Sequence, residues 1–152
     1  VSGYRASPDD AYLIIRGIRT LDVRLERHEK NTKEVIKFLS KQKKIKEVLY
    51  PYKKNTKNFK NWKKYYSGAT GLLGLVINSK NKSSVYKFVN SLELFGIGYS
   101  WGGFESLAVY QDIQRKFPKY NEKNLHIVRL HIGLEDPKDL IADLKKSLRH
   151  IK

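Results

Sequence analysis

The sequence predicts an α+β domain in which helices pack on one face of a mostly antiparallel sheet. Two observations lead to this prediction. Segments with the apolar period of a helix are mixed with short apolar runs typical of strands, without a regular strand-helix-strand rhythm. The length of 152 residues suits one compact domain with a sizeable core.

Helix is predicted from Ser7 and Pro8 to about Ser40. Ser7 can cap the first turn, Pro8 suits its first position, and two acidic residues follow at the positive helix end. Gly17 is the expected position of a break, since glycine costs roughly 1 kcal/mol relative to alanine inside a helix. The apolar residues at helical spacing are Leu13, Ile14, Ile18, Leu21, Leu25, Val35, Ile36 and Leu39.

The middle of the chain is expected to contain shorter elements. Their predicted ranges are a strand at 45–50, a loop at 53–60, a short helical turn at 61–66, a strand at 71–77 and a helix at 83–92. Pro51 ends the first of these strands. The continuous apolar run at 71–77 indicates a strand buried on both faces.

The carboxyl-terminal part is expected to contain two more strands and a final helix. The strands are predicted at 95–100 and 125–132. Asp136 can cap the helix, and Pro137 suits its first turn. Its apolar stripe consists of Leu140, Ile141, Leu144, Leu148 and Ile151.

Composition excludes several classes of protein. With no cysteine, the chain has no disulfide, no thiolate metal site and no cysteine nucleophile, and we expect a cytoplasmic protein. No apolar run approaches the roughly 18 to 20 residues of a membrane span, so no membrane partner is expected. Because the chain contains no methionine, even at its start, we expect a processed product or a fragment.

The net charge of +16 has two interpretations. It can indicate binding to nucleic acid or to an acidic surface, or it can reflect a solvated surface rich in lysine. Lysine far outnumbers arginine, and specific recognition of phosphates and bases favours arginine, so the charge argues only weakly for nucleic acid.

A Gly-Gly turn follows the predicted strand at 95–100. Gly102 and Gly103 either supply the conformational freedom of a tight turn or expose backbone N–H groups to a ligand. Trp101, directly before them, belongs either to the core or to the wall of a pocket. Ser100 adds a small hydroxyl beside it.

Arg129 is a lone charge in the apolar strand predicted at 125–132. If its face of the sheet is open, it is a solvated charge; if the face lines a cleft, its guanidinium suits a bidentate bond to a carboxylate. His126 and His131 are five residues apart on this strand and therefore lie on opposite faces. We expect no metal site.

These stretches resemble the Cys/Met-metabolism family of pyridoxal-phosphate (PLP)-dependent enzymes, and within it the C-terminal domain of the bacterial cystathionine β-lyases. The motif at 100–103, Ser-Trp-Gly-Gly, is typical of the β-lyases, whereas related γ-synthases and γ-lyases usually have leucine in place of the tryptophan. Residues 10–28, 65–72 and 127–136 also match the family. The resemblance covers about residues 9 to 151 and implies the small C-terminal domain of the aspartate-aminotransferase-like (type I) fold.

The resemblance also implies roles for four residues. Arg129 matches the arginine that binds the α-carboxylate of the amino-acid substrate. Ser100 matches a serine beside the catalytic lysine and the substrate carboxylate, and Tyr99 and Trp101 match aromatic residues that line the pocket. The implied reaction converts cystathionine to homocysteine, pyruvate and ammonia, with PLP as cofactor.

The chain departs from the family in lacking the residues that hold PLP. The Schiff-base lysine should follow a threonine and precede an apolar-Gly-His-Ser/Thr-Asp run, but Lys33 and Lys57 have only the preceding threonine. We therefore expect residues 1–8 to be a lead-in and 9–152 to be a C-terminal domain whose large PLP-binding domain is absent. Such a chain would contain no catalytic residue, bind no cofactor and be inactive alone.

Two alternatives remain open. The chain could be the matching domain of a cystathionine γ-synthase or γ-lyase, or a basic non-catalytic module that binds nucleic acid or protein. A further expectation concerns assembly. The face that would pack on a large domain carries apolar groups, so we expect the chain to form a homo-oligomer.

Overall fold

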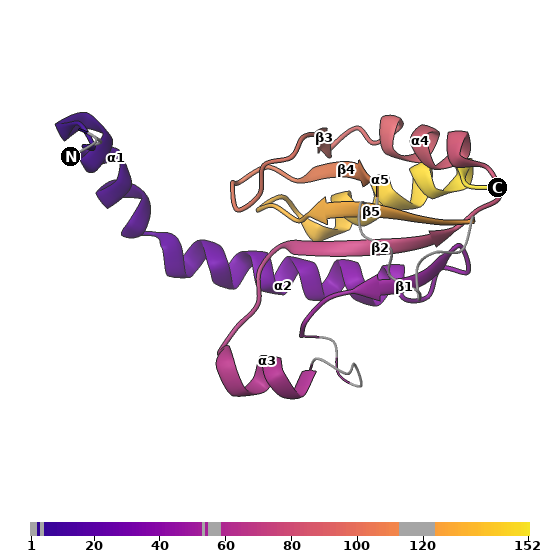
Figure 1. The fold of residues 1–152 in the computed structure, drawn as a ribbon, viewed down its shortest axis with the longest axis horizontal. Helices are drawn as coiled ribbons and strands as arrows, with labels where there is room; N and C mark the ends of the chain where they lie inside the picture. Colours follow the sequence, from indigo (N-terminus) through magenta and orange to yellow (C-terminus); the bar gives the residue numbers. More distant parts are fainter. Residues whose placement is uncertain (1–2, 4, 53, 55–58, 113–123) are drawn as a thin grey trace.

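The computed structural model describes residue 3 and residues 5–52, 54, 59–112 and 124–152 (Figure 1). The helices are α1 (Pro8–Ile18), α2 (Leu21–Leu39), α3 (Phe59–Tyr65), α4 (Lys82–Asn90) and α5 (Pro137–Ser147), and the short 3₁₀ helix η2 (Leu148–His150) follows α5. The strands are β1 (Ile45–Leu49), β2 (Leu72–Asn78), β3 (Gly96–Ile97), β4 (Leu107–Gln111) and β5 (Leu125–His131).

The strands form one sheet in the order β1-β2-β5-β4-β3. All neighbouring strands are antiparallel except β3 and β4, which are parallel. This sheet with its helices confirms the predicted α+β class. The two longest strands, β2 and β5, are neighbours inside the sheet, so the side chains of β5 are far from either edge.

The main core lies between one face of the sheet and helices α2, α4 and α5. On β5, Val128 and Leu130 point into this core, and Leu75 does so from β2. The core residues that the helices contribute are Val35, Leu39, Val85, Phe88, Val89, Leu140 and Leu144. Because side chains alternate along a strand, Arg129 lies on the opposite face, which these helices do not cover.

The first two helices begin and end close to where the sequence predicts. Ser7 and Asp10 form a reciprocal capping box, and Pro8 occupies the first turn of α1. The break falls after Ile18, next to the expected Gly17. Helix α1 then projects away from the body of the protein, as Figure 1 shows, and it contains no buried residue.

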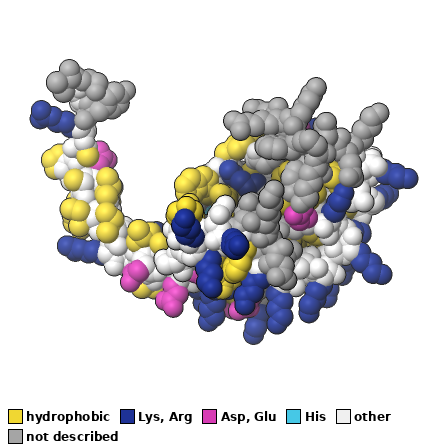
Figure 2. All heavy atoms as spheres, turned by 60° about the horizontal axis from the view of Figure 1, so that its bottom comes forward, with side chains coloured by type: hydrophobic (Ala, Val, Ile, Leu, Met, Phe, Trp, Pro, Cys, Tyr) yellow, Lys and Arg dark blue, Asp and Glu magenta, His cyan; other side chains and the backbone are white. Residues whose placement is uncertain are grey.

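The apolar stripe of α1 is therefore exposed. Figure 2 shows hydrophobic side chains along the arm that α1 forms. The apolar residues of this arm, each 52–64% exposed, are Tyr12, Leu13, Ile14, Ile15 and Ile18. At the start of α2, Leu21, Val23 and Leu25 are exposed as well. The periodic pattern marks a helix face that nothing in the described structure covers.

The prediction for the region between α4 and β5 is wrong in part. Only Gly96–Ile97 of the expected strand at 95–100 forms a strand, and it is exposed. The sequence prediction also missed β4 (Leu107–Gln111), which fills the place between β3 and β5. The backbone leaves the sheet after Ile97 because residues 98–106 form a loop whose partners are side chains.

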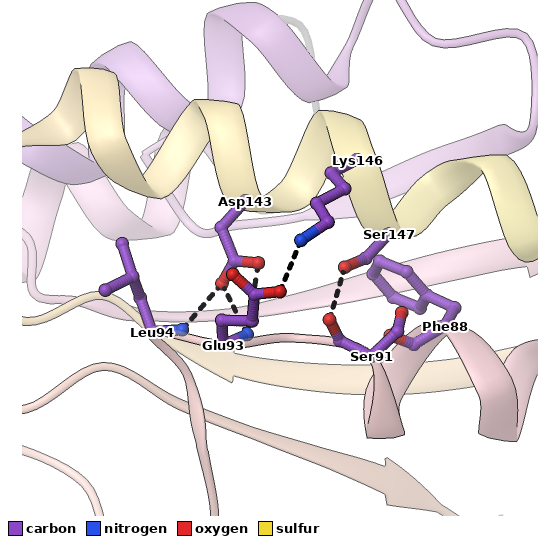
Figure 3. Close-up of polar contacts among 7 residues, drawn as sticks. All are labelled: Phe88, Ser91, Glu93, Leu94, Asp143, Lys146 and Ser147. Atoms are coloured by element: carbon purple, nitrogen blue, oxygen red, sulfur yellow. Dashed lines mark hydrogen bonds and ion pairs between the residues drawn. The ribbon is translucent and has the colours of Figure 1, made fainter.

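Helix α5 fixes the turn between α4 and β3 (Figure 3). The buried Asp143 carboxylate accepts hydrogen bonds from the backbone N–H groups of Glu93, at 3.1 Å, and Leu94, at 2.9 Å. The Ser147 hydroxyl donates to the Ser91 carbonyl at 3.0 Å, and Lys146 pairs with the Glu93 carboxylate. These contacts anchor the chain just before it enters β3 and the loop at 98–106.

Most of the loop predicted at 53–60 lies outside the described residues, and α3 already begins at Phe59. Within the ranges that the structure describes, no helix combines the length and apolar character needed to cross a membrane.

Candidate functional site

The candidate site is formed by residues 98–106, here called the site loop, and the strand β5 with the segment that follows it. The site loop connects β3 to β4. Its exposed aromatic side chains are Tyr99, Trp101 and Phe104, which are 73%, 64% and 72% exposed. Trp101 is therefore not a core residue, and of its two interpretations only that of a surface or pocket wall remains.

Arg129 holds the first part of the site loop. Its Nη2 atom donates to the carbonyl oxygens of Gly98 at 3.2 Å, Tyr99 at 2.6 Å and Ser100 at 3.3 Å. The guanidinium carbon lies 5.9 Å from the centre of the Tyr99 ring. Among the described residues, Nε and Nη1 have no hydrogen-bond partner. The arginine thus has a fixed orientation and keeps donors for a carboxylate.

His131 holds the apex of the site loop. Its Nε2 atom lies 3.1 Å from the Gly102 nitrogen and 3.1 Å from the Gly103 carbonyl oxygen. Gly102 has φ +82°, in the left-handed region that favours glycine. Burial lowers the pKa of His131 below its usual value of 6.5, and the His28 ring lowers it further, although the bond to Gly103 opposes the change.

Glu135 and Ser106 hold the end of the site loop. The Ser106 amide donates to Glu135 Oε1 at 2.7 Å, and the Ser106 hydroxyl donates to Oε2 at 2.9 Å. The same hydroxyl accepts a hydrogen bond from the Gly133 amide at 2.8 Å. A side chain on Gly133 would overlap with the Phe104 carbonyl oxygen, so this close approach requires glycine.

Successive residues of the segment 129–135 therefore hold successive parts of the site loop, and the Leu134 amide also donates to the Phe104 carbonyl group at 2.8 Å. Arg129 binds residues 98–100, His131 binds the 102–103 turn, and Gly133 and Glu135 bind Ser106. Arg129 and His131 share one face because side chains alternate along β5, which ends at His131. Beyond the strand, Gly133 and Leu134 bind the loop through their backbone N–H groups. The intervening Val128 and Leu130 face the core, so one stretch of chain serves both the core and the site loop.

Helix α2 supports this stretch from behind. The Asn31 amide donates to the carbonyl oxygens of Gly133 at 3.0 Å and Glu135 at 2.8 Å. His28 Nδ1 lies 2.7 Å from the Ile132 carbonyl oxygen, to which it donates, and its ring centre is 5.1 Å from that of His131. Both side chains are buried. The strand end that carries His131 and Glu135 is thus fixed independently of the site loop.

The structure brings together all four residues that the sequence marks as a substrate-binding set. Tyr99 and Ser100 contact Arg129 through their carbonyl oxygens, and Trp101 lies between the segment bound by Arg129 and the segment bound by His131. Sequence reasoning missed His131, which it considered only as a metal ligand, and the Ser106–Glu135 pair. Alternation along the strand places His131 on the same face as Arg129, but no sequence signal marks its backbone partners or the Ser106–Glu135 pair. In the described part of the chain, no group of three or more His, Cys, Asp or Glu residues could hold a metal ion.

Comparison with known proteins identifies the family. The family model of the Cys/Met metabolism PLP-dependent enzymes matches residues 1–149, and the chain belongs to this family. Among its relatives, the cystathionine β-lyase of Bordetella avium is 39% identical over 96% of this chain, and that of Haemophilus influenzae is 37% identical over 98%. The chain spans only 37% and 39% of the lengths of these two proteins.

A solved structure confirms the fold of the family. A Campylobacter jejuni protein assigned as an O-acetylhomoserine (thiol)-lyase superposes with a TM-score of 0.82 at 32% identity. The match covers 97% of this chain and 34% of that protein, whose crystal structure contains N'-pyridoxyl-lysine-5'-monophosphate. The cofactor of the family is thus PLP, as the resemblance implies.

Proposed function

We propose that this chain is the C-terminal domain of a PLP-dependent cystathionine β-lyase and that it binds the substrate carboxylate. Residues 9–152 form this domain, with residues 1–8 as a lead-in. The observation that carries the proposal is the fixed guanidinium of Arg129, oriented by three site-loop carbonyl groups and with Nε and Nη1 free of described partners. The β-lyases among the relatives support the choice of substrate.

The proposed role follows from the chemistry of the side chains. The Nε and Nη1 atoms of Arg129 can each donate to a carboxylate oxygen, and such charge-assisted bonds are strong. Tyr99 and Trp101 provide exposed aromatic surface on the same loop. Ser100 contributes its carbonyl group to the orientation of Arg129. Together these groups would bind the amino-acid end of cystathionine.

PLP, when bound, would supply the electron sink for bond breaking at the substrate Cα and Cβ. The described residues of this chain do not fit its attachment. Lys33 pairs with Glu29 and lies 4.4 Å from the centre of the Tyr52 ring, and Lys57 lies outside the described residues. We therefore assign no bond-breaking step to this chain, and we propose that a separate part of the enzyme provides the lysine and the phosphate-binding groups.

The test compares the 152-residue chain with the full-length polypeptide that contains it. Each is mixed with PLP and cystathionine, and the absorbance of the internal aldimine and the release of pyruvate are measured. We expect both signals from the full-length polypeptide and neither from the 152 residues. Steady pyruvate release by the 152 residues alone would contradict the proposed division of roles.

The same assay separates the β-lyase from the related γ-enzymes. Cleavage on the β side of cystathionine releases homocysteine and pyruvate, whereas cleavage on the γ side releases cysteine and a four-carbon oxo acid. We expect the first pair of products. Formation of the second pair would identify a γ-lyase and would show that Trp101 does not determine which bond breaks.

The net charge of +16 supports a second candidate, a basic module that binds nucleic acid. Figure 2 shows Lys and Arg side chains spread over much of one face. A titration of random single-stranded oligonucleotides at increasing salt distinguishes the two candidates, because phosphate contacts weaken steeply with salt. Binding that persists near physiological salt would favour this candidate over the β-lyase domain.

A further inference from the structure

The apex of the site loop depends on a single imidazole. His131 is 2% exposed, and its Nε2 atom is within hydrogen-bond distance of both the Gly102 N–H and the Gly103 carbonyl group. When Nε2 carries no proton it accepts from Gly102, and when it carries one it donates to Gly103. In either neutral tautomer the ring therefore binds the turn.

The turn at 102–103 directly follows the residues that orient Arg129. Trp101 is flanked on one side by Ser100, whose carbonyl accepts from Arg129 Nη2, and on the other by Gly102, whose amide lies against His131. The exposed indole has no buried surroundings of its own to fix it. Its position is therefore set by the backbone, through Arg129 before it and His131 after it.

The surroundings of His131 favour the neutral form of its ring and hold the ring in place. The ring of His28 from α2 is tilted by 49° against that of His131, with the ring centres 5.1 Å apart, and it is fixed by its own bond to the Ile132 carbonyl group. Arg129 on the same strand opposes a second positive charge, whereas Glu135 favours one. Burial has the largest effect and disfavours the imidazolium. A doubly protonated ring could still donate to Gly103 but could no longer accept from Gly102.

We propose that His131 is a positioning residue for the carboxylate site: it fixes the Gly102–Gly103 turn, and through that turn it sets the position of Trp101 and the direction of the Arg129 guanidinium. This inference rests on the proposed function for its link to substrate. The contacts of His131 with Gly102 and Gly103, however, lie within the 152 residues and do not depend on the proposed function.

The test uses two substitutions at His131 and two matched substitutions at His126. His131→Gln keeps a donor and an acceptor at the end of the side chain, whereas His131→Leu has neither. His126 lies on the same strand, is also buried, and binds Tyr110 and the Ser79 carbonyl group on the other face. His126→Leu and His126→Gln therefore report the general cost of changing a buried histidine in β5.

Two measurements distinguish positioning from a purely structural role. In the 152-residue chain, NMR follows hydrogen exchange of the Gly102 amide and the Nε–H resonance of Arg129. In the full-length polypeptide, kcat and KM for cystathionine are measured. We expect His131→Leu to increase the exchange rate of the Gly102 amide about tenfold and to raise KM about tenfold, because one hydrogen bond is lost. The value of kcat should stay nearly unchanged. His131→Gln should restore the exchange rate and KM, and neither His126 variant should change them.

The outcomes separate this inference from the proposed function. If His131→Leu matches His126→Leu in both Gly102 exchange and KM, the positioning role is refuted. A faster Gly102 exchange with an unchanged KM also refutes it, because the turn would then not affect substrate. If the full-length wild-type polypeptide does not cleave cystathionine, the proposed function fails. The exchange data and the Arg129 resonance then still decide whether His131 sets the loop and the guanidinium.

Discussion

Ser106 and Glu135 join two segments through a matched pair of hydrogen bonds. The amide and the hydroxyl of Ser106 each donate to a different oxygen of the same carboxylate, at 2.7 and 2.9 Å. The serine side chain is fully buried, and its hydroxyl also accepts from Gly133. One small side chain therefore satisfies a carboxylate oxygen and a backbone amide at the end of the site loop.

We expect Ser106→Ala to lower the free energy of unfolding by about 1–3 kcal/mol, because it removes the hydroxyl partner of a partly buried Glu135 oxygen and of the buried Gly133 amide. Urea unfolding of the 152-residue chain measures the change. Ser83→Ala, at an exposed position on α4, is the matched control and should change stability by less than about 0.5 kcal/mol. Equal effects of the two substitutions would contradict the role of the Ser106–Glu135 pair.

Arg129→Lys should impair substrate binding although it keeps the positive charge. Lysine lacks the planar pair of donors and cannot reproduce the three bonds to the loop carbonyl groups. In the full-length polypeptide we expect kcat/KM for cystathionine to fall roughly tenfold to a hundredfold, the range for a lost charge-assisted bond. Arg149→Lys, at an exposed position, should leave kcat/KM unchanged. A fall of the same size in both variants would argue against a carboxylate contact at Arg129.

The pKa of His131 predicts a contribution to stability that depends on pH. Folding lowers the pKa of His131 below 6.5, its usual value in an unfolded chain. At pH values between the folded-state pKa and 6.5, the unfolded chain therefore binds more protons than the folded chain. The contribution of neutral His131 is therefore complete above about pH 6.5 and decreases as the pH falls below that value. Glutamine does not titrate, so His131→Gln should lose less stability than the wild type between about pH 7.5 and about pH 5.

Urea unfolding of both chains at these two pH values measures the difference. Carboxylates and the other histidines change protonation over the same range, but they are common to both chains and cancel in the comparison. An identical pH dependence of the wild type and His131→Gln would show that the pKa of His131 is not lowered by folding.

The exposed face of α1 predicts self-association of the isolated chain. Contiguous apolar surface on a helix that projects from the body favours contact between copies. We propose a homo-oligomer at low salt and expect the double substitution Ile14→Gln and Ile18→Gln to shift it towards monomer. Sedimentation velocity measures the distribution. The double control Lys30→Gln and Lys37→Gln, at exposed polar positions of α2, should leave it unchanged, and a strictly monomeric wild type would refute the proposal.

The sequence predicts best those elements whose local signals agree with their packing. Helix α5 has its cap at Asp136, proline at its start and a buried apolar stripe, and each of these is visible in the sequence. Helix α1 has an equally clear stripe, but the stripe is exposed. Periodicity identifies the apolar face of a helix, and it contains no information on what covers that face.

The site loop could not be predicted from local pattern. Phe95, Ile97 and Tyr99 alternate with small residues as in a strand, but the backbone leaves the sheet after Ile97. The loop is held by side chains from residues about 30 positions further along the chain, and no local propensity reports such contacts. Arg129 was found because a charge in an apolar strand is unusual; His131 binds backbone atoms, which have no sequence signature.

The alternation along β5, in which Arg129 and His131 share one face, imposes a constraint on chain length. Substituting Arg129 or His131 removes the contacts of one side chain with the site loop. Inserting or deleting a single residue within β5 would instead turn the strand residues beyond that point to the opposite face. The core would then receive polar groups while the loop lost its anchors. Natural variation in this segment should therefore consist of substitutions, and changes in length should be confined to segments outside it.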